Sequence, residues 1–170
     1  MEFLLDSLLE YSRAGRLAIH AEKTDVEIMV KEIVDLRGFN DNFIIKTDNL
    51  PVFMTYAASL RQVLRNIIGN AVKHHDKKKG KIIIEARKSG NFYEFKVSDD
   101  GPGIPEKFRE RVFGMFQTLR AKDEVEGSGM GLALVKKIVE TYNGKVWLET
   151  AQPHGTMVFF TWPFTTKTGN

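Results

Sequence analysis

Three short segments of the sequence combine residue types and spacings that could bind a charged ligand. In the first, LRQVLRNIIGNAVK, the side chains of Asn66, Asn70 and Lys73 are spaced i, i+4 and i+7 and so project from one line of a predicted helix. Asparagine is a poor helix former. Amide oxygens can coordinate Mg²⁺, and a lysine offers positive charge to phosphate. The alternative is a polar face exposed to solvent.

The second segment, SDDGPGIP, directly follows an alternating stretch that is typical of a half-buried strand. Gly101 and Gly103 would let the backbone turn sharply and approach a flat ligand closely. Asp99, fixed at the strand end, could accept a hydrogen bond from an exocyclic amine such as that of adenine. Asp100 would then point to solvent or cap the turn. The alternative is an ordinary surface loop.

The third segment, GSGMGLALVKK, places Gly127, Gly129 and Gly131 directly before a predicted helix. Unpaired N–H groups at the positive end of a helix dipole can cradle a phosphate. The spacing is a weak signal by itself, because it matches neither the dinucleotide-binding fingerprint nor a Walker loop.

A long irregular stretch, residues 101–128, separates the strand end from this helix. Long loops in compact domains are usually functional or disordered. Phe113 and Phe116 could fix one end of the stretch, and the charged run RAKDEVE could then move as a lid over phosphates. The alternative is that the two phenylalanines only pack in the core.

The elements that must position these segments follow from hydrophobic periodicity and from capping residues. Asp25 and Gly38 bound a predicted helix, and Gly90 marks a hairpin. We expect an α/β (α+β) two-layer sandwich, in which about three main helices pack on one mixed or antiparallel sheet, with a short N-terminal helix. The expected elements are helices within 1–16, 25–38, 57–76, 105–116 and 127–144, a hinge at 13–24, and strands at 43–47, 52–55, 81–89, 91–99, 145–150 and 155–163.

The composition suits one globular domain, since the 170 residues are 42% hydrophobic and 28% charged. The chain has no cysteine, which excludes disulfide scaffolds and fits a reducing, cytoplasmic compartment. The sequence shows no signal-peptide pattern and no apolar run of about 18 residues, so we expect no direct membrane contact. The basic cluster at 73–81 lacks interleaved aromatic or arginine support, so we expect no nucleic-acid partner.

Five segments, in order, resemble the N, G1, F, G2 and G3 boxes of sensor histidine kinases: NIIGNAVKH, DDGPGIP, FGMFQ, GSGMGLALVKKIVE and GTMVFF. The similarity covers the whole catalytic ATP-binding domain of those kinases, about residues 25–163. This GHKL fold is shared with DNA gyrase, heat-shock chaperone and mismatch-repair ATPases. FLLDSLLEYSR resembles the end of the second helix of the dimerisation and phosphoacceptor hairpin. The resemblance implies that 1–20 is a hairpin remnant and linker, 21–165 the catalytic domain and 166–170 a tail.

The resemblance also implies roles for individual residues. Asn70 and Asn66 would hold Mg²⁺ between the phosphates, Lys73 would contact phosphate, and these three would form the catalytic set. Asp99 would bind the adenine amine, with Thr156 nearby. The ATP-binding set would further include Gly101, Gly103 and Ile104 around the adenine and Gly127, Ser128, Gly129, Met130, Gly131 and Leu132 around the phosphates.

Three departures from the family pattern qualify these roles. Hydrolytic relatives carry a water-activating glutamate where this chain has Asn66, so phosphoryl transfer is favoured over hydrolysis. Met130 replaces the usual leucine of its box, a mild change in volume. The phosphoacceptor histidine has no match, since the four histidines lie in other segments: His20, His74, His75 and His154.

The resemblance thus implies a protein-histidine kinase domain that transfers the ATP γ-phosphoryl to a histidine absent from this chain. The phosphoryl group would pass on to a response-regulator receiver domain, and the acceptor helix would come from the same or a partner subunit of a homodimeric parent. Two alternatives stay open. One is an anti-sigma-type serine kinase, and the other is a non-enzymatic nucleotide-binding module.

Overall fold

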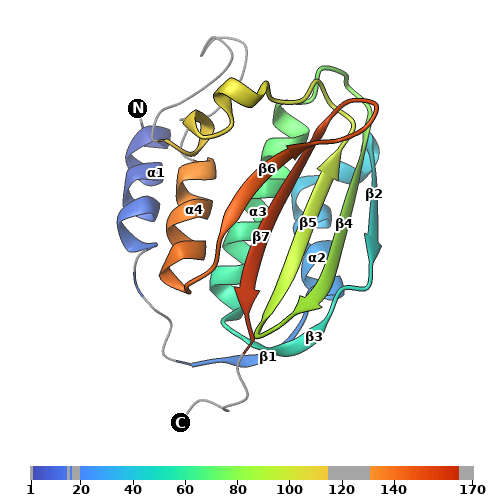
Figure 1. Ribbon diagram of the computed structural model, residues 1–170. Helices are drawn as coiled ribbons and strands as arrows, with labels where there is room; N and C mark the ends of the chain where they lie inside the picture. The colour runs from blue at the N-terminus through green and yellow to red at the C-terminus, as the bar shows by residue number, and fades with distance from the viewer. Residues whose placement is uncertain (1, 15, 17–19, 115–130, 165–170) are drawn as a thin grey trace.

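A computed structural model describes residues 2–14, 16, 20–114 and 131–164 of the chain (Figure 1). Three helices cover one face of a five-stranded sheet, and a short N-terminal helix lies beside the last of them (Figure 1). This is the expected two-layer α/β arrangement. The elements are α1 (Glu2–Arg13), β1 (Glu22–Asp25), α2 (Val26–Arg37), η1 (Phe39–Asp41), β2 (Phe43–Asp48), β3 (Val52–Thr55), α3 (Ala57–Lys73), β4 (Gly80–Ser89), β5 (Phe92–Asp99), η2 (Glu106–Phe108), η3 (Arg111–Phe113), α4 (Gly131–Thr141), β6 (Val146–Thr150) and β7 (Thr156–Pro163).

The main sheet is mixed and has the strand order β2-β4-β5-β7-β6. β2 runs parallel to β4, and the other neighbours are antiparallel. Alternate residues of β7 are buried, because successive side chains of a strand point to opposite faces of the sheet. Because β5 and β7 are antiparallel, the carboxyl end of β5 lies beside the first residues of β7, where Ser98 pairs with Met157.

The helices bury apolar stripes against the sheet, as their periodicity predicts. α2 begins at Asp25, whose side chain accepts a hydrogen bond from the Ile28 N–H at 3.2 Å. It ends at Gly38, which adopts the left-handed conformation with φ of 66°. Both caps match the expectation. The fully buried core includes Leu60, Leu64, Ile67 and Ile68 of α3, Ile82 and Ile84 of β4, and Phe95, Phe160 and Trp162 of β5 and β7.

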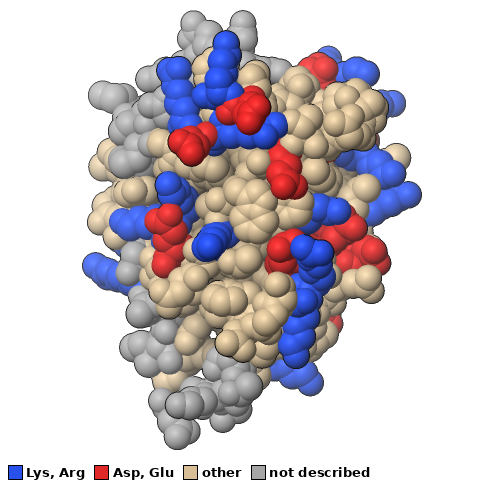
Figure 2. Space-filling model, in the orientation of Figure 1, with Lys and Arg blue, Asp and Glu red and all other residues tan. Residues whose placement is uncertain are grey.

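The opposite face of the sheet is open and carries mixed charge (Figure 2). Lysines and arginines are interspersed with acidic residues there, and two ion pairs, Arg87–Glu94 and Lys96–Glu85, measure 2.8 and 2.6 Å. Basic side chains on this face are thus partly neutralised by acidic neighbours.

Three details differ from the sequence-based expectation. Part of the predicted hinge forms β1, which pairs with β3 in a separate two-stranded sheet; the segment EKTD is too short and too polar to show an alternating pattern. α3 ends at Lys73 rather than continuing to Asp76. The short helix predicted at 105–116 is instead two 3₁₀ turns, η2 and η3, in its described part.

The N-terminal helix α1 contacts the main domain at its carboxyl end. The Lys137 ammonium group of α4 donates a hydrogen bond of 2.8 Å to the Tyr11 carbonyl and lies 4.3 Å from the centre of the Tyr11 ring. Leu5 and Leu9 of the same helix are 59% and 44% exposed, so its apolar stripe is only partly covered. Within the described residues, no helix is both long and apolar enough to cross a lipid bilayer.

Candidate functional site

Asp99 lies at the end of β5 with its carboxylate held by the backbone. Its Oδ1 atom accepts hydrogen bonds from the N–H groups of Gly101 at 2.9 Å and Thr156 at 3.3 Å. No hydrogen bond from the described residues reaches Oδ2. Burial raises the pKa of the Asp99 carboxyl, although the two backbone N–H groups oppose that rise. The carboxylate thus presents a fixed, partly desolvated acceptor at the strand end.

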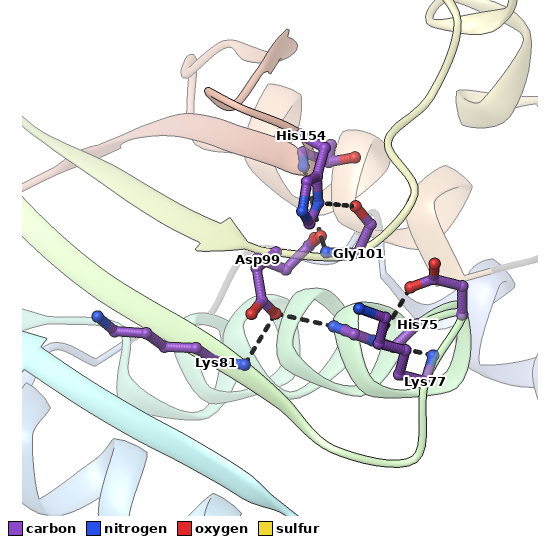
Figure 3. A network of polar contacts seen from close by, with 9 residues as sticks. His75, Lys77, Lys81, Asp99, Gly101 and His154 are labelled. Atoms are coloured by element: carbon purple, nitrogen blue, oxygen red, sulfur yellow. Dashed lines mark hydrogen bonds and ion pairs between the residues drawn. The ribbon is translucent and has the colours of Figure 1, made fainter.

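The turn that follows Asp99 packs closely against the turn that precedes β7. A Cβ atom added at Gly103, whose φ is 81°, would lie 3.1 Å from the Gly155 carbonyl oxygen. A Cβ atom added at Gly155 would collide with the Asp99 carbonyl oxygen. His154 adds a direct link, since its Nδ1 atom lies 3.0 Å from the Gly101 carbonyl oxygen (Figure 3). Thr156, expected near the adenine, contacts Asp99 directly through its backbone N–H.

Asp100 has a role that the sequence did not indicate. Its side chain is 50% exposed, yet its Oδ1 atom accepts hydrogen bonds from the Lys81 N–H and from His75 Nε2, both at 2.8 Å. Partial burial favours the neutral carboxyl, but these hydrogen bonds outweigh it and lower the pKa of Asp100. The expectation that Asp100 points to solvent or caps its own turn was thus incomplete.

The polar stripe of α3 faces the start of α4. A Cβ atom added at Gly131 would lie 3.1 Å from Oδ1 and 3.2 Å from Nδ2 of Asn70, so the two residues are in contact. The Asn66 amide nitrogen donates a 2.8 Å hydrogen bond to the Gln62 carbonyl within the helix, so its oxygen is the atom that can act as an acceptor for a ligand. Lys73 is exposed in the last turn.

Two further predicted site residues are half-buried and pack against the hydrophobic core. They are Ile104, in the turn after Asp99, and Leu132, in the first turn of α4. The remaining glycine-box residues, Gly127, Ser128, Gly129 and Met130, lie outside the described residues, as do Phe116 and the charged stretch predicted to be a lid. Phe113 is half-buried and packs against the core.

The donor set near the start of α4 suits Mg²⁺ bound together with a nucleotide. Mg²⁺ prefers oxygen ligands and usually takes only one or two from the protein, the rest coming from phosphates and water. The amide oxygens of Asn66 and Asn70 can supply these two. Among the described residues no group of three or more His, Cys, Asp or Glu side chains could hold a metal without phosphate.

The sequence did not indicate that two histidines contact the residues just after Asp99, a segment (100–104) called the Asp99 turn below. His75 and His154 are 25 and 53 residues away from their partners along the chain, so no local pattern joins them. The one available sign was the position of His75 just beyond a helix that already carried candidate ligands.

Three kinds of similarity place the chain among known proteins. Residues 55–166 match the family model described as histidine kinase-, DNA gyrase B-, and HSP90-like ATPase. Cyanobacterial phytochrome A of Nostoc sp. is 36% identical across 96% of the chain, and the adaptive-response sensory kinase SasA of Microcystis aeruginosa is 29% identical across 96%. The chain spans only 22% of the phytochrome and 44% of SasA.

Solved structures agree with these relatives. Full-length ShkA in complex with AMPPNP is 26% identical, superposes with a TM-score of 0.80 and is matched over 97% of this chain and 36% of its own length. The catalytic domain of the histidine kinase ThkA, also 26% identical, has a TM-score of 0.71 over 85% of this chain and 96% of that domain. The chain belongs to the histidine kinase-, DNA gyrase B- and HSP90-like ATPase family, as an ATP-binding domain of the sensor histidine kinase type.

Proposed function

We propose that this domain binds Mg·ATP and transfers its γ-phosphoryl group to a histidine of a dimerisation hairpin, from which a response regulator receives it. The observation that carries this proposal is the Asp99 carboxylate. It is fixed by two backbone N–H groups at the strand end, and within the described part of the chain its second oxygen accepts no hydrogen bond.

The adenine end of the site would be built by the Asp99 turn. The free carboxylate oxygen accepts a hydrogen bond from the exocyclic amine of adenine, and a charged acceptor makes that bond stronger than a neutral one would. Gly101 and Gly103 keep side chains away from the ring, while Ile104 offers apolar contact. Thr156 holds the carboxylate from the neighbouring strand.

The phosphate end would be built by α3 and the start of α4. Asn70 and Asn66 would hold Mg²⁺, which when bound neutralises phosphate charge. Lys73 adds a positive charge, and the first N–H groups of α4, from Gly131 onward, lie at the positive end of the helix dipole. Gly127, Ser128, Gly129 and Met130 would complete this cradle.

The chemistry would consist mainly of positioning and charge stabilisation, as in other phosphoryl transfers. An acceptor imidazole nitrogen attacks the γ-phosphorus, the bond to the bridging oxygen breaks, and ADP leaves. Asn66 stands where hydrolytic relatives have a glutamate, and an amide cannot accept the proton of an attacking water. This favours transfer to a presented imidazole over hydrolysis.

The partners and location of the parent protein are part of the proposal. The relative ThkA has been solved in complex with the response regulator TrrA, and that structure superposes on this chain with a TM-score of 0.74 at 25% identity. By analogy, a receiver domain is the final phosphoryl acceptor here. Residues 1–20 would be the end of a dimerisation hairpin, the parent a homodimer, and its compartment the cytoplasm.

The test combines nucleotide binding with phosphoryl transfer. The chain and an Asn70→Ala variant are titrated with Mg·ATP by calorimetry, with Asn91→Ala in the exposed β4–β5 turn as a matched control. Each protein is then incubated with Mg·ATP and a dimerisation hairpin from the phytochrome relative. We expect the parent and the control to bind ATP and to form acid-labile phosphohistidine, and Asn70→Ala to do neither well.

The other outcomes identify the alternatives. Acid-stable phosphoserine on a partner protein would support the serine kinase. ATP binding without transfer to any hairpin tried would support a nucleotide-binding module. If ATP does not bind at all, the site assignment is wrong.

A further inference from the structure

His75 is buried between three parts of the chain that meet near the Asp99 turn. Its side chain is only 1% exposed, and its ring packs edge-on against Phe43 at 5.4 Å between centroids. Cβ atoms added at Gly80 and Gly101 would lie 2.8 and 3.5 Å from His75 Cδ2, so the ring fills the space between the start of β4 and the turn.

The hydrogen bonds of His75 define its tautomer. The Lys77 N–H lies 3.0 Å from Nδ1 and can only donate, so Nδ1 must be the unprotonated acceptor. The ring proton therefore resides on Nε2, which donates to Asp100 Oδ1 at 2.8 Å. Asp76 also faces Nδ1, at 3.4 Å, but a neutral Nδ1 has no proton to give it.

Asp100 transmits this contact to the neighbouring residue. Its Oδ1 atom is held by His75 and by the Lys81 N–H, so the carboxylate is fixed between the end of α3 and the start of β4. Side chains of successive residues at a strand end point to opposite sides. Fixing the Asp100 side chain therefore limits rotation of the peptide between Asp99 and Asp100, and so limits the direction of the Asp99 carboxylate.

We propose that His75, as its Nε2–H tautomer, is a positioning residue for nucleotide binding that orients Asp99 by holding Asp100. This inference rests on the proposed role of Asp99 as the adenine acceptor. In this role His75 acts through its hydrogen bond to Asp100 and not on the nucleotide itself. His154 and Thr156 hold the opposite side of the same turn, so the acceptor is fixed from two directions.

Two amide substitutions separate positioning from general stability. In His75→Gln the amide nitrogen takes the place of Nε2 and can still donate to Asp100, but the acceptor for Lys77 is lost. In His75→Asn the amide oxygen takes the place of Nδ1 and can still accept from Lys77, but the side chain is too short for Asp100. Each variant loses one hydrogen bond, but asparagine also leaves more empty space beside Phe43, so affinities are compared well below the unfolding temperatures of both variants.

The proposal predicts different ATP affinities for this matched pair. By calorimetry with Mg·ATP, we expect His75→Asn to bind up to about ten-fold more weakly than His75→Gln, because ATP must then order an Asp99 carboxylate whose neighbour has lost its charge-assisted hydrogen bond. Exposed His20, changed to Asn and to Gln, provides the control pair, which should match the parent. Equal affinities for the two His75 variants, with both proteins fully folded, would overturn the proposal.

An Asp99→Asn variant measured beside them separates this inference from the function on which it rests. If Asp99→Asn binds ATP as well as the parent does, the adenine role of Asp99 is wrong, and the positioning role falls with it. If Asp99→Asn loses affinity while the two His75 variants bind equally, only the positioning role is wrong.

Discussion

Replacing Asp99 by asparagine should weaken nucleotide binding and stabilise the fold at neutral pH. The amide oxygen of the substituted side chain would keep both hydrogen bonds that Asp99 Oδ1 accepts, from Gly101 and Thr156. The free Oδ2, however, would become an NH₂ group that faces the donor amine of adenine. A hydrogen bond to a charged group contributes about 1.5–3 kcal/mol. We therefore expect the Kd for Mg·ATP to rise roughly 10- to 150-fold.

The effect on stability has the opposite sign because burial raises the pKa of Asp99. A carboxyl whose pKa is higher in the folded than in the unfolded state favours folding when protonated, and that contribution is lost as the pH rises through the folded-state pKa. An asparagine does not titrate. The unfolding temperature of the variant, relative to the parent, should therefore increase from about pH 4, near the ordinary aspartate pKa, to pH 7.

The assays are calorimetric titration at pH 7 and thermal unfolding across this pH range. Asp48→Asn, at the exposed end of β2, is the matched control and should change neither quantity much. Two results would refute the reasoning. One is an Asp99→Asn variant that binds Mg·ATP within about two-fold of the parent. The other is a variant whose relative stability falls as the pH rises.

Two further predictions concern a buried hydrogen bond of Trp162 and the contact between α3 and α4. In the parent protein the buried Trp162 indole N–H donates to Thr55 Oγ1 at 2.7 Å, and Thr55→Val removes this acceptor. The variant should lose about 1–3 kcal/mol of stability, at about 2–4 °C of unfolding temperature per kcal/mol. Its ATP affinity should not change. A Thr55→Val, Trp162→Phe double variant that is no more stable than the sum of the single effects would contradict the assignment. Gly131→Ala should not lower the unfolding temperature, because alanine favours the helical conformation more than glycine does. It should weaken Mg·ATP binding several-fold, because the added Cβ would displace the Asn70 amide. Unchanged affinity in calorimetry would show that this contact does not matter.

The sequence predicted the elements whose apolar residues repeat at a clear period. Alternation identified β5 and β7, and the caps Asp25 and Gly38 fixed both ends of α2. The sequence did not predict β1, because its four residues are mostly polar and their strand conformation depends on pairing with β3. Within 105–116 the sequence predicts one helix and the structure has the two 3₁₀ turns, because over so few residues an α-helix and a 3₁₀ turn show similar apolar spacing.

In the candidate site, too, features within one segment could be predicted from the sequence, whereas contacts between distant segments could not. The residue types and spacing of Asn66, Asn70 and Asp99 are visible in single segments, so their candidacy could be read directly from the sequence. The contact of Asn70 with Gly131 and the hydrogen bond of His75 to Asp100 join residues that are 61 and 25 positions apart. Such contacts depend on how α3 packs against α4 and β4, which no segment specifies alone.

The geometry also suggests that the two ends of the site act separately on nucleotide binding. The adenine end is held by a closed set of hydrogen bonds around Asp99, from His75 through Asp100 on one side and from Thr156 on the other. The phosphate end depends instead on helix packing, where Asn70 meets Gly131. Because ADP and ATP share the adenine, changes at Asp99 or His75 should weaken both nucleotides by the same factor. Changes at Gly131 should have effects that depend on the phosphates and on Mg²⁺, so the ratio of the two affinities distinguishes which end a variant has altered.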